Sequence, residues 1–200
     1  MGYYTIKQRR IVDEDGIDYE VFHFSCVDDA VIDLPWLRGI RFHQAPAQPI
    51  QLRFEEEVPE DGVFVDFLGQ PVPLVSQAFR DALIQCGAGN LDFYETRIEG
   101  AEDFDDMPRY FAMNVVGKIE VADPARSSGI RPFGVMGADL YDQFTPRSDL
   151  PAGMTIFRMA EQSSTLLVSE QVVRLCETLG VQTIEFLPLA PYGSVSSTKP

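Results

Sequence analysis

Basic residues are few in this chain of 200 residues. It carries 16 Lys and Arg against 31 Asp and Glu, which gives a formal net charge of -15 at pH 7. Phosphate contacts need a basic surface, so this balance argues against nucleic acid as a direct partner, and it disfavours an anionic membrane surface. The acidity favours either a basic protein partner, whose approach it accelerates, or simply good solubility.

Cysteines and long apolar runs are also scarce. Cys26, Cys86 and Cys176 include no C-x-x-C pair, and their odd number indicates a reducing compartment. The N-terminus has no apolar signal region, and no apolar run reaches the length of a membrane span. Hydrophobic residues make up 45% of the chain, which is typical of a globular protein. We therefore expect a folded, cytoplasmic protein.

Motifs for catalysis, cofactors and metals are missing. The chain has no P-loop, and Gly87-Ala88-Gly89 lacks the third glycine and the preceding strand of a dinucleotide site. It has no G-x-S-x-G nucleophile elbow. His23 and Cys26 have a loosely metal-like spacing, but no second pair completes a zinc site. The sequence thus predicts no catalytic residue, no cofactor and no metal, and a protein that is not an enzyme.

What the chain does contain is a stretch that occurs twice. Moving Phe64–Phe93 by 93 positions places it without a gap on Phe157–Phe186, and Leu74-Val75-Ser76 then meets Leu167-Val168-Ser169. A shared spacing over this length indicates an internal repeat. Each copy predicts a unit of strand, strand, capped helix and strand, over about 64–95 and 157–188.

The predicted helix of each unit has local start and stop signals. Ser76 and Ser169 suit the N-cap, and apolar residues follow at helical spacing. Gly87 and Gly180 stand where a left-handed residue ends a helix. The simplest interpretation of both units is that they are scaffold without chemistry of their own.

The remaining segments complete a single α+β domain over residues 1–190, with mostly antiparallel sheet and few helices. Residues 1–25 predict a hairpin with a type I′ turn at Asp15-Gly16. Trp36 suits a loop anchor, and Tyr110–Val121 is a long strand with a bulge near Gly117. We expect loop over 122–151 and a frayed tail over 191–200.

Two acidic segments are the candidate contact surfaces, Glu55–Asp61 and Glu99–Asp106. The second has an aromatic residue between two aspartates, which resembles an interface anchor with a charged rim, although a plain solvated loop is the alternative. Repulsion among its carboxylates should keep it extended. The predicted partner-binding residues are Glu99, Glu102, Asp103, Phe104, Asp105 and Asp106.

Several short segments, in this order along the chain, resemble family-eleven immunity proteins of bacterial polymorphic toxin systems. They are Tyr3-Tyr4-x-Ile6, Pro35-Trp36-Leu37-Arg38-Gly39, Pro73-Leu74-Val75-Ser76-x-x-Phe79-Arg80, Asp92-Phe93-Tyr94, Tyr110-Phe111-x-x-Asn114-Val115-x-Gly117, Leu167-Val168-Ser169 and Ile184-x-Phe186. The resemblance covers roughly residues 3–187. Each motif alone marks only a strand or a helix, and their order is what is specific.

The resemblance implies a cytoplasmic protein that binds and neutralises a cognate toxin delivered by neighbouring cells. Such toxins are often nucleases, and contact-dependent or type VI secretion often delivers them. The family pattern supplies neither catalytic residues nor a fixed toxin-binding motif, so no functional residue is transferred from it. The alternative is a small enzyme or ligand-binding protein with an acidic cleft between the two repeat units. The oligomeric state stays open.

Overall fold

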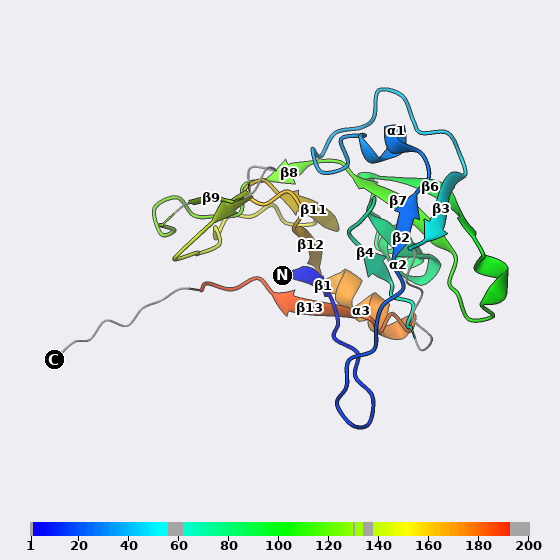
Figure 1. Ribbon diagram of the computed structural model, residues 1–200. Coiled ribbons are helices and arrows are strands. Elements are labelled where there is room, and N and C mark those ends of the chain that lie inside the picture. The colour runs from blue at the N-terminus through cyan, green and yellow to red at the C-terminus, as the bar shows by residue number, and fades with distance from the viewer. Residues whose placement is uncertain (1, 56–61, 130, 134–137, 193–200) are drawn as a thin grey trace.

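A computed structural model describes the protein at residues 2–55, 62–129, 131–133 and 138–192 (Figure 1). This described part contains three α-helices, α1 (Asp29–Ile32), α2 (Gln77–Gln85) and α3 (Glu170–Thr178). Its strands form a six-stranded, a five-stranded and a two-stranded sheet. Most pairings in them are antiparallel, so the predicted α+β class is confirmed.

The six-stranded sheet holds the first repeat unit. Its strand order is β2 (Phe24–Cys26), β3 (Ile50–Phe54), β6 (Leu91–Glu99), β7 (Tyr110–Val115), β5 (Leu74–Ser76) and β4 (Phe67–Leu68). The long β6 has two partners. Its first half is antiparallel to β7, from Leu91 opposite Val115 to Glu95 opposite Phe111, and its second half is parallel to β3.

The five-stranded sheet holds the second unit and the N-terminal strand. Its order is β13 (Ile184–Pro188), β1 (Tyr3–Gln8), β12 (Leu166–Ser169), β11 (Ile156–Met159) and β8 (Lys118–Ile119), with β8 parallel to β11. A separate ribbon of β9 (Arg131–Phe133) and β10 (Ala138–Leu140) extends to one side in Figure 1. Most other described residues of 122–151 are loop, as predicted.

Both units have the predicted order of strand, strand, helix and strand. In the first unit, β5 and β6 are both antiparallel to β7. In the second, β12 and β13 are both antiparallel to β1. The strands on either side of each helix are therefore parallel, and the helix forms the crossover that parallel strands require. Each unit is completed by one strand from outside it.

The ends of α2 and α3 follow local signals in the sequence. Ser76 Oγ accepts from Phe79 N at 3.2 Å, as predicted for an N-cap. Ser169 is the N-cap residue of α3, as predicted, but its hydroxyl makes no cap hydrogen bond. The first N–H group of α3, on Glu170, donates to the backbone oxygen of Gly2. Gly87 and Gly180 have φ of 78° and 76°, the predicted left-handed conformation.

A buried apolar cluster joins the two units. It takes Phe79, Ala82 and Leu83 from α2, and Val172 and Cys176 from α3. Alternate residues of both sheets complete it: Ile6, Val75, Phe111, Met113, Val115, Ile156, Leu166, Val168 and Ile184. Burial raises the pKa of the Cys176 thiol to about 12, so this thiol acts as a small hydrophobe.

A second apolar cluster covers the opposite face of the six-stranded sheet. Trp36 is buried in it, at 4% exposure, and its ring lies edge-on to Phe42 and Tyr94. The indole Nε1 donates to Val31 O at 2.7 Å, so the one polar atom of the side chain is satisfied. The predicted role of Trp36 as a loop anchor is confirmed.

The carboxylate of Asp66 connects the two units by hydrogen bonds. Its Oδ1 accepts from Ser76 Oγ at 2.6 Å, next to the start of α2. Its Oδ2 accepts from Thr183 Oγ1 at 2.6 Å, immediately before β13. Thr183 Oγ1 in turn accepts from the backbone N–H of Asp66 at 2.6 Å. One carboxylate thereby fixes the helix start of the first unit to the last strand of the second.

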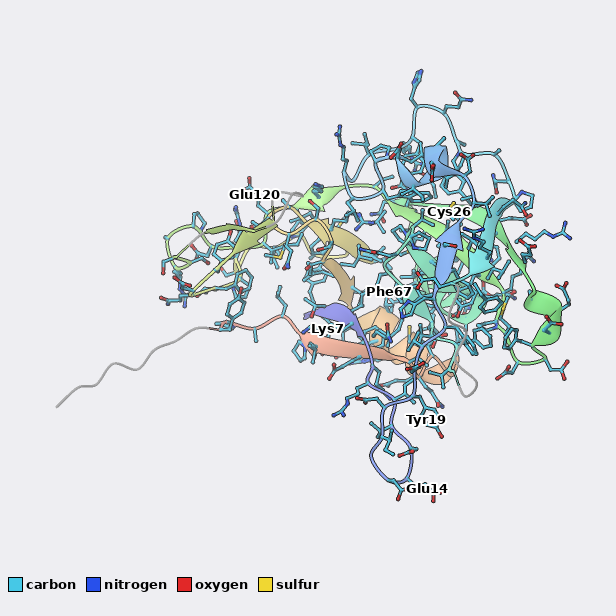
Figure 2. All side chains as sticks on the ribbon, in the orientation of Figure 1. Lys7, Glu14, Tyr19, Cys26, Phe67 and Glu120 are labelled. Atoms are coloured by element: carbon cyan, nitrogen blue, oxygen red, sulfur yellow. The ribbon has the colours of Figure 1, made fainter. Side chains whose placement is uncertain are left out.

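The predicted N-terminal hairpin is wrong in its strand pairing. β1 pairs with β12 and β13, whereas β2 pairs with β3 in the other sheet. Residues 9–20, which we call the arm, extend between them with a turn at Asp13–Gly16 (Figure 2). Gly16 alone in this turn has a positive φ, of 81°, and a type I′ turn needs two such residues. The arm therefore turns through a longer loop.

The predicted long strand over Tyr110–Val121 is also corrected. It is interrupted at Gly117, where φ is 102°. Before this residue the chain belongs to the six-stranded sheet as β7, and after it to the five-stranded sheet as β8. The expected bulge is thus a crossing between sheets, which the conformational freedom of glycine permits.

The C-terminal tail is described as far as Tyr192. This residue forms an antiparallel bridge with Phe144, and the two rings stack with centroids 5.2 Å apart. The expected fraying therefore does not include Tyr192, because an aromatic neighbour holds it. The rest of the predicted tail, 193–200, lies outside the described residues, and the single domain over 1–190 stays a prediction.

We expect Gly180→Val to lower the free energy of unfolding by about 1 kcal/mol or more, because a β-branched residue resists a positive φ. A Cβ at Gly180 would meet no atom within 4 Å, so the cost is backbone strain alone. Gly89→Val is the matched control, since it has equal space and no positive φ. Chemical denaturation measures both variants, and equal stability losses would contradict the assignment.

We also expect Asp66→Ala and Thr183→Ala each to destabilise the fold by about 1–3 kcal/mol, the range for hydrogen bonds to a charged group. The double variant should lose less than the sum, because the two side chains share one interaction. Thr178→Ala serves as the control, since its hydroxyl bonds only locally to Arg174 O. Additive losses at positions 66 and 183 would show that Asp66 does not couple the units.

Candidate functional site

The predicted contact residues lie on the loop between β6 and β7, which we call the acidic loop (Glu99–Asp106). β6 is parallel to β3, with Arg53 opposite Glu99. The carboxyl ends of parallel neighbours reach the same edge of a sheet, so both acidic segments start at one place. The first segment begins at Glu55, directly after β3, and its residues 56–61 lie outside the described part of the chain.

The acidic loop is folded, and the prediction that it is extended is wrong. Gly100 turns the chain at φ 81°, and a 3-10 turn follows at Ala101–Asp103. Asp103 N donates to Gly100 O at 3.2 Å, and Phe104 N donates to Ala101 O at 3.3 Å. These bonds hold the backbone compact, while the side chains remain free to separate their charges in water.

The carboxylates of this loop are available to a partner. All five acidic side chains, those of Glu99, Glu102, Asp103, Asp105 and Asp106, are exposed. None of the ion pairs formed among the described residues uses any of them. The loop is therefore a local concentration of unneutralised negative charge on a folded backbone.

Phe104 faces the protein more than the solvent. Its ring is half-buried and lies 4.9 Å from Phe54, 5.1 Å from Phe22 and 5.5 Å from Phe64, measured between ring centroids. This aromatic group anchors the acidic loop on the edge of the sheet. The structure thus shows a positioning contact for Phe104, and a contact with a partner stays a prediction.

The arm is a second exposed surface, which sequence analysis did not identify as a binding candidate. It extends away from the sheets, with Glu14 near its tip (Figure 2). Val12, Ile17 and Tyr19 on it are exposed, Ile17 by 66%. Exposed apolar residues surrounded by charges are typical of interaction surfaces. The sequence signal for this surface was the presence of apolar residues among acidic ones from Val12 to Tyr19.

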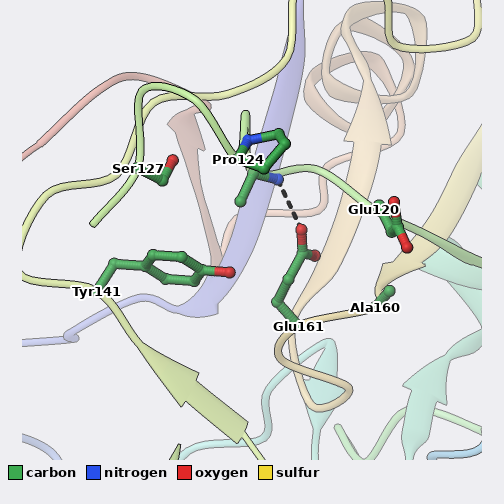
Figure 3. A pocket seen from close by; sticks show the side chains of 7 residues that line it. Glu120, Pro124, Ser127, Tyr141, Ala160 and Glu161 are labelled. Atoms are coloured by element: carbon green, nitrogen blue, oxygen red, sulfur yellow. Dashed lines mark hydrogen bonds between the residues drawn. The ribbon is translucent and has the colours of Figure 1, made fainter. Parts of the chain in front are cut away.

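A pocket of about 370 Å³ lies between the segment after β8 and the turn after β11 (Figure 3). Its lining consists of Glu120, Ala122, Pro124, Ser127, Tyr141, Ala160 and Glu161. Ser127 Oγ donates to Thr145 O at 3.2 Å and accepts from Thr145 N at 3.0 Å, so both of these hydrogen bonds are made with backbone atoms of Thr145. The lining includes neither a histidine nor a thiol.

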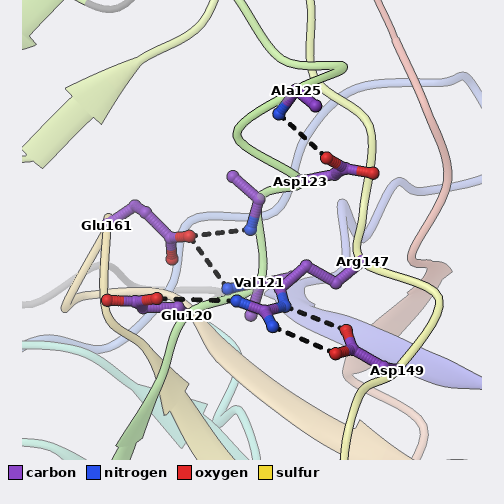
Figure 4. Close-up of polar contacts among 8 residues, drawn as sticks. Glu120, Val121, Asp123, Ala125, Arg147, Asp149 and Glu161 are labelled. Carbon is purple, nitrogen blue, oxygen red and sulfur yellow. Dashed lines mark hydrogen bonds and ion pairs between the residues drawn. The ribbon is translucent and has the colours of Figure 1, made fainter.

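Glu161 holds one wall of this pocket in place. Its Oε1 accepts from Val121 N at 2.8 Å and from Ala122 N at 2.7 Å (Figure 4). Its Oε2 is buried without a hydrogen-bond partner. The nearby Glu120 lies 3.6 Å from Arg147, which is also bound to Asp149. With two carboxylates and no positioned nucleophile and base, the pocket suits a cationic group better than a reaction.

The candidates for metal or thiol chemistry are not assembled into a site. Within the described residues, no group of three or more His, Cys, Asp or Glu could hold a metal ion. His23 is exposed while Cys26 is buried, and the three cysteines are free thiols. Burial raises the pKa of the Cys26 and Cys86 thiols, which disfavours the reactive thiolate.

Comparisons with known proteins identify the family. No match is found among curated proteins. Among the described helices, none is long and apolar enough to cross a membrane. A family model described as an immunity protein family, Imm11, matches residues 5–190. This match covers nearly the whole chain, including both repeat units and the acidic loop, so the chain belongs to the Imm11 family of immunity proteins.

Proposed function

We propose that this protein binds and neutralises a cognate antibacterial toxin as a stoichiometric inhibitor without turnover. The observation that carries the proposal is the match to an immunity family over residues 5–190. The inhibitor acts in the cytoplasm of the protected cell, during competition between bacteria, against an effector delivered by a system such as type VI secretion. Its free thiols and the absence of positioned catalytic groups in the described pocket agree with this role.

The toxin that fits this surface is basic, and we propose a nuclease. An enzyme that binds nucleic acid needs a positive surface for the phosphates. A protein with a net charge of -15 presents the opposite field, which accelerates association with such an enzyme at low salt. The bound inhibitor then covers the positive surface of the toxin that would otherwise contact the nucleic acid.

The proposed contact surface is the acidic loop. Its five carboxylates are exposed and unpaired within the described chain, so binding a basic partner breaks none of the described internal ion pairs. Its backbone is held by a 3-10 turn and by the aromatic contacts of Phe104. A preformed loop loses less conformational entropy on binding than a flexible one. The exposed part of the Phe104 ring supplies an apolar centre between the carboxylates.

The alternative function, a small enzyme or ligand-binding protein with an acidic cleft between the units, has weaker support. Residues from both units meet there in a buried apolar cluster that includes Phe79, Leu83 and Val172. The described pocket lies elsewhere, beside Glu161, and offers no catalytic pair. Toxin binding is therefore the function that the geometry favours.

Co-expression tests the function itself. The partner is the toxin encoded beside this gene, with its C-terminal toxic domain produced from an inducible promoter. We expect growth to be restored only when this protein is present, and the two chains to co-purify at equal stoichiometry. A catalytically dead toxin variant separates binding from protection. Toxicity unchanged by this protein, with no complex formed, would refute the proposal.

Reversing the charge at Asp103, Asp105 and Asp106 to lysine should slow toxin association by about tenfold or more at low salt, because steering depends on this field. The salt dependence of the association rate should become flatter. Phe104→Ala should mainly raise the dissociation rate, because the loss of an anchoring contact changes dissociation more than association. Stopped-flow or surface-based kinetics measures both constants.

The matched control reverses the same number of charges on the arm, at Glu14, Asp15 and Glu20, which are all exposed. A general loss of field would slow association equally in both triple variants. A specific contact at the acidic loop would slow it more in the first and remove growth protection there. If only the arm variant lost binding, the arm would be the contact surface and the acidic loop would be excluded.

A further inference from the structure

A buried arginine without a counter-ion lies at the start of the hairpin between β11 and β12. Arg158 is 1% exposed, and its Nη1 donates to the backbone oxygen of Ser163 at 2.9 Å. Its Nε and Nη2 are buried and have no hydrogen-bond partner. Burial lowers the pKa of Arg158 to about 10, so the guanidinium is still charged at neutral pH. An unpaired buried charge is unfavourable, and a bound anion would offset this cost.

Two further cations lie beside this guanidinium. Lys118 is directly opposite Arg158 in the β8–β11 pairing, and its Nζ donates to Ser163 Oγ at 2.5 Å. Gly117 N donates to Gly39 O at 2.7 Å, and a Cβ on Gly39 would lie 2.8 Å from Lys118 Cγ. Arg38, the residue before Gly39, therefore lies near Lys118 and belongs to a different loop. Burial and then the charges of Arg158 and Arg38 lower the pKa of Lys118.

Among the described residues, no carboxylate forms an ion pair with this cationic cluster, defined as Arg38, Lys118 and Arg158. Some other arginines of the described chain pair with acids, as Arg41 does with Asp92 and Arg109 with Glu95. Glu120 and Glu161 are the carboxylates nearest along the chain to Lys118 and Arg158. Glu120 lies 3.6 Å from Arg147, and Oε1 of Glu161 accepts from Val121 N and Ala122 N. The cluster is therefore a local excess of positive charge in a chain with 31 acidic residues.

We propose that the cationic cluster binds a phosphate group. The two unpartnered donors, Nε and Nη2, form the side edge of the guanidinium, whose parallel N–H groups match two oxygens of one oxyanion. Three positive charges favour the dianionic phosphate over a singly charged carboxylate. Arg38 and Lys118 are exposed, so their long side chains can move to admit the anion toward Arg158.

This site lies on elements different from those of the acidic loop, and its test needs no toxin. Isothermal titration calorimetry with inorganic phosphate, at constant ionic strength set with chloride, measures binding to the full chain. We expect a saturable heat with one phosphate per chain, and weaker binding of acetate. A second titration uses a simple phosphate monoester. A site for free phosphate would not bind the ester, whereas a site for phosphorylated molecules would bind it.

Lys118→Gln and Arg158→Lys should each weaken phosphate binding by about tenfold, the effect of losing one charge-assisted hydrogen bond. Arg158→Lys keeps the charge but removes the two-donor edge, and the exposed Lys118 provides a test if the buried variant does not fold. Arg97→Gln, an exposed arginine on β6, is the control and should bind as the wild type does. Absent binding, acetate affinity equal to that of phosphate, or unchanged affinity in both variants would overturn the proposal.

Discussion

The fold depends on an apolar core that neither repeat unit can form alone. Phe79 and Leu83 of α2 and Val172 and Cys176 of α3 belong to the same buried cluster. A helix of nine residues is too short to be stable by itself in water, so each helix needs the packing that the other unit supplies. The Asp66 carboxylate then fixes the relative position of the units, because it accepts from Ser76 on one side and Thr183 on the other.

Local features of the fold could be predicted from the sequence, because they depend on a few neighbouring residues. The helix ends at Gly87 and Gly180 and the anchoring of Trp36 follow from side-chain volume, backbone freedom and a polar atom that needs a partner. The position of the Ser169 N-cap was also predictable, whereas the bond from Glu170 N to the distant Gly2 O depends on the pairing of β1 with β12. A local pattern contains no information about such a distant partner.

Long-range pairing was the main source of error. The segment Tyr3–Gln8 has the same alternation whether it pairs with the next strand or with a strand over 150 residues away, and it pairs with β12 and β13. Gly117 likewise signals an irregularity, but only the structure shows that the chain changes sheets there. For the candidate site, the acidic residues and their exposure were predictable, whereas the inward packing of Phe104 depends on Phe22, Phe54 and Phe64 from three other segments.

The exposed charged side chains and the apolar core occupy different parts of this protein. Most carboxylates of the acidic loop and of the arm are exposed near strand ends, while Ile11, Ala101 and Phe104 from the same segments pack against the second apolar cluster. Substitutions there change the field and the contacts without opening a cavity, and surface changes of this kind cost little stability. Under the proposed function, changes in these loops adapt the contact surface to a toxin while the shared core and the Asp66 bonds stay the same.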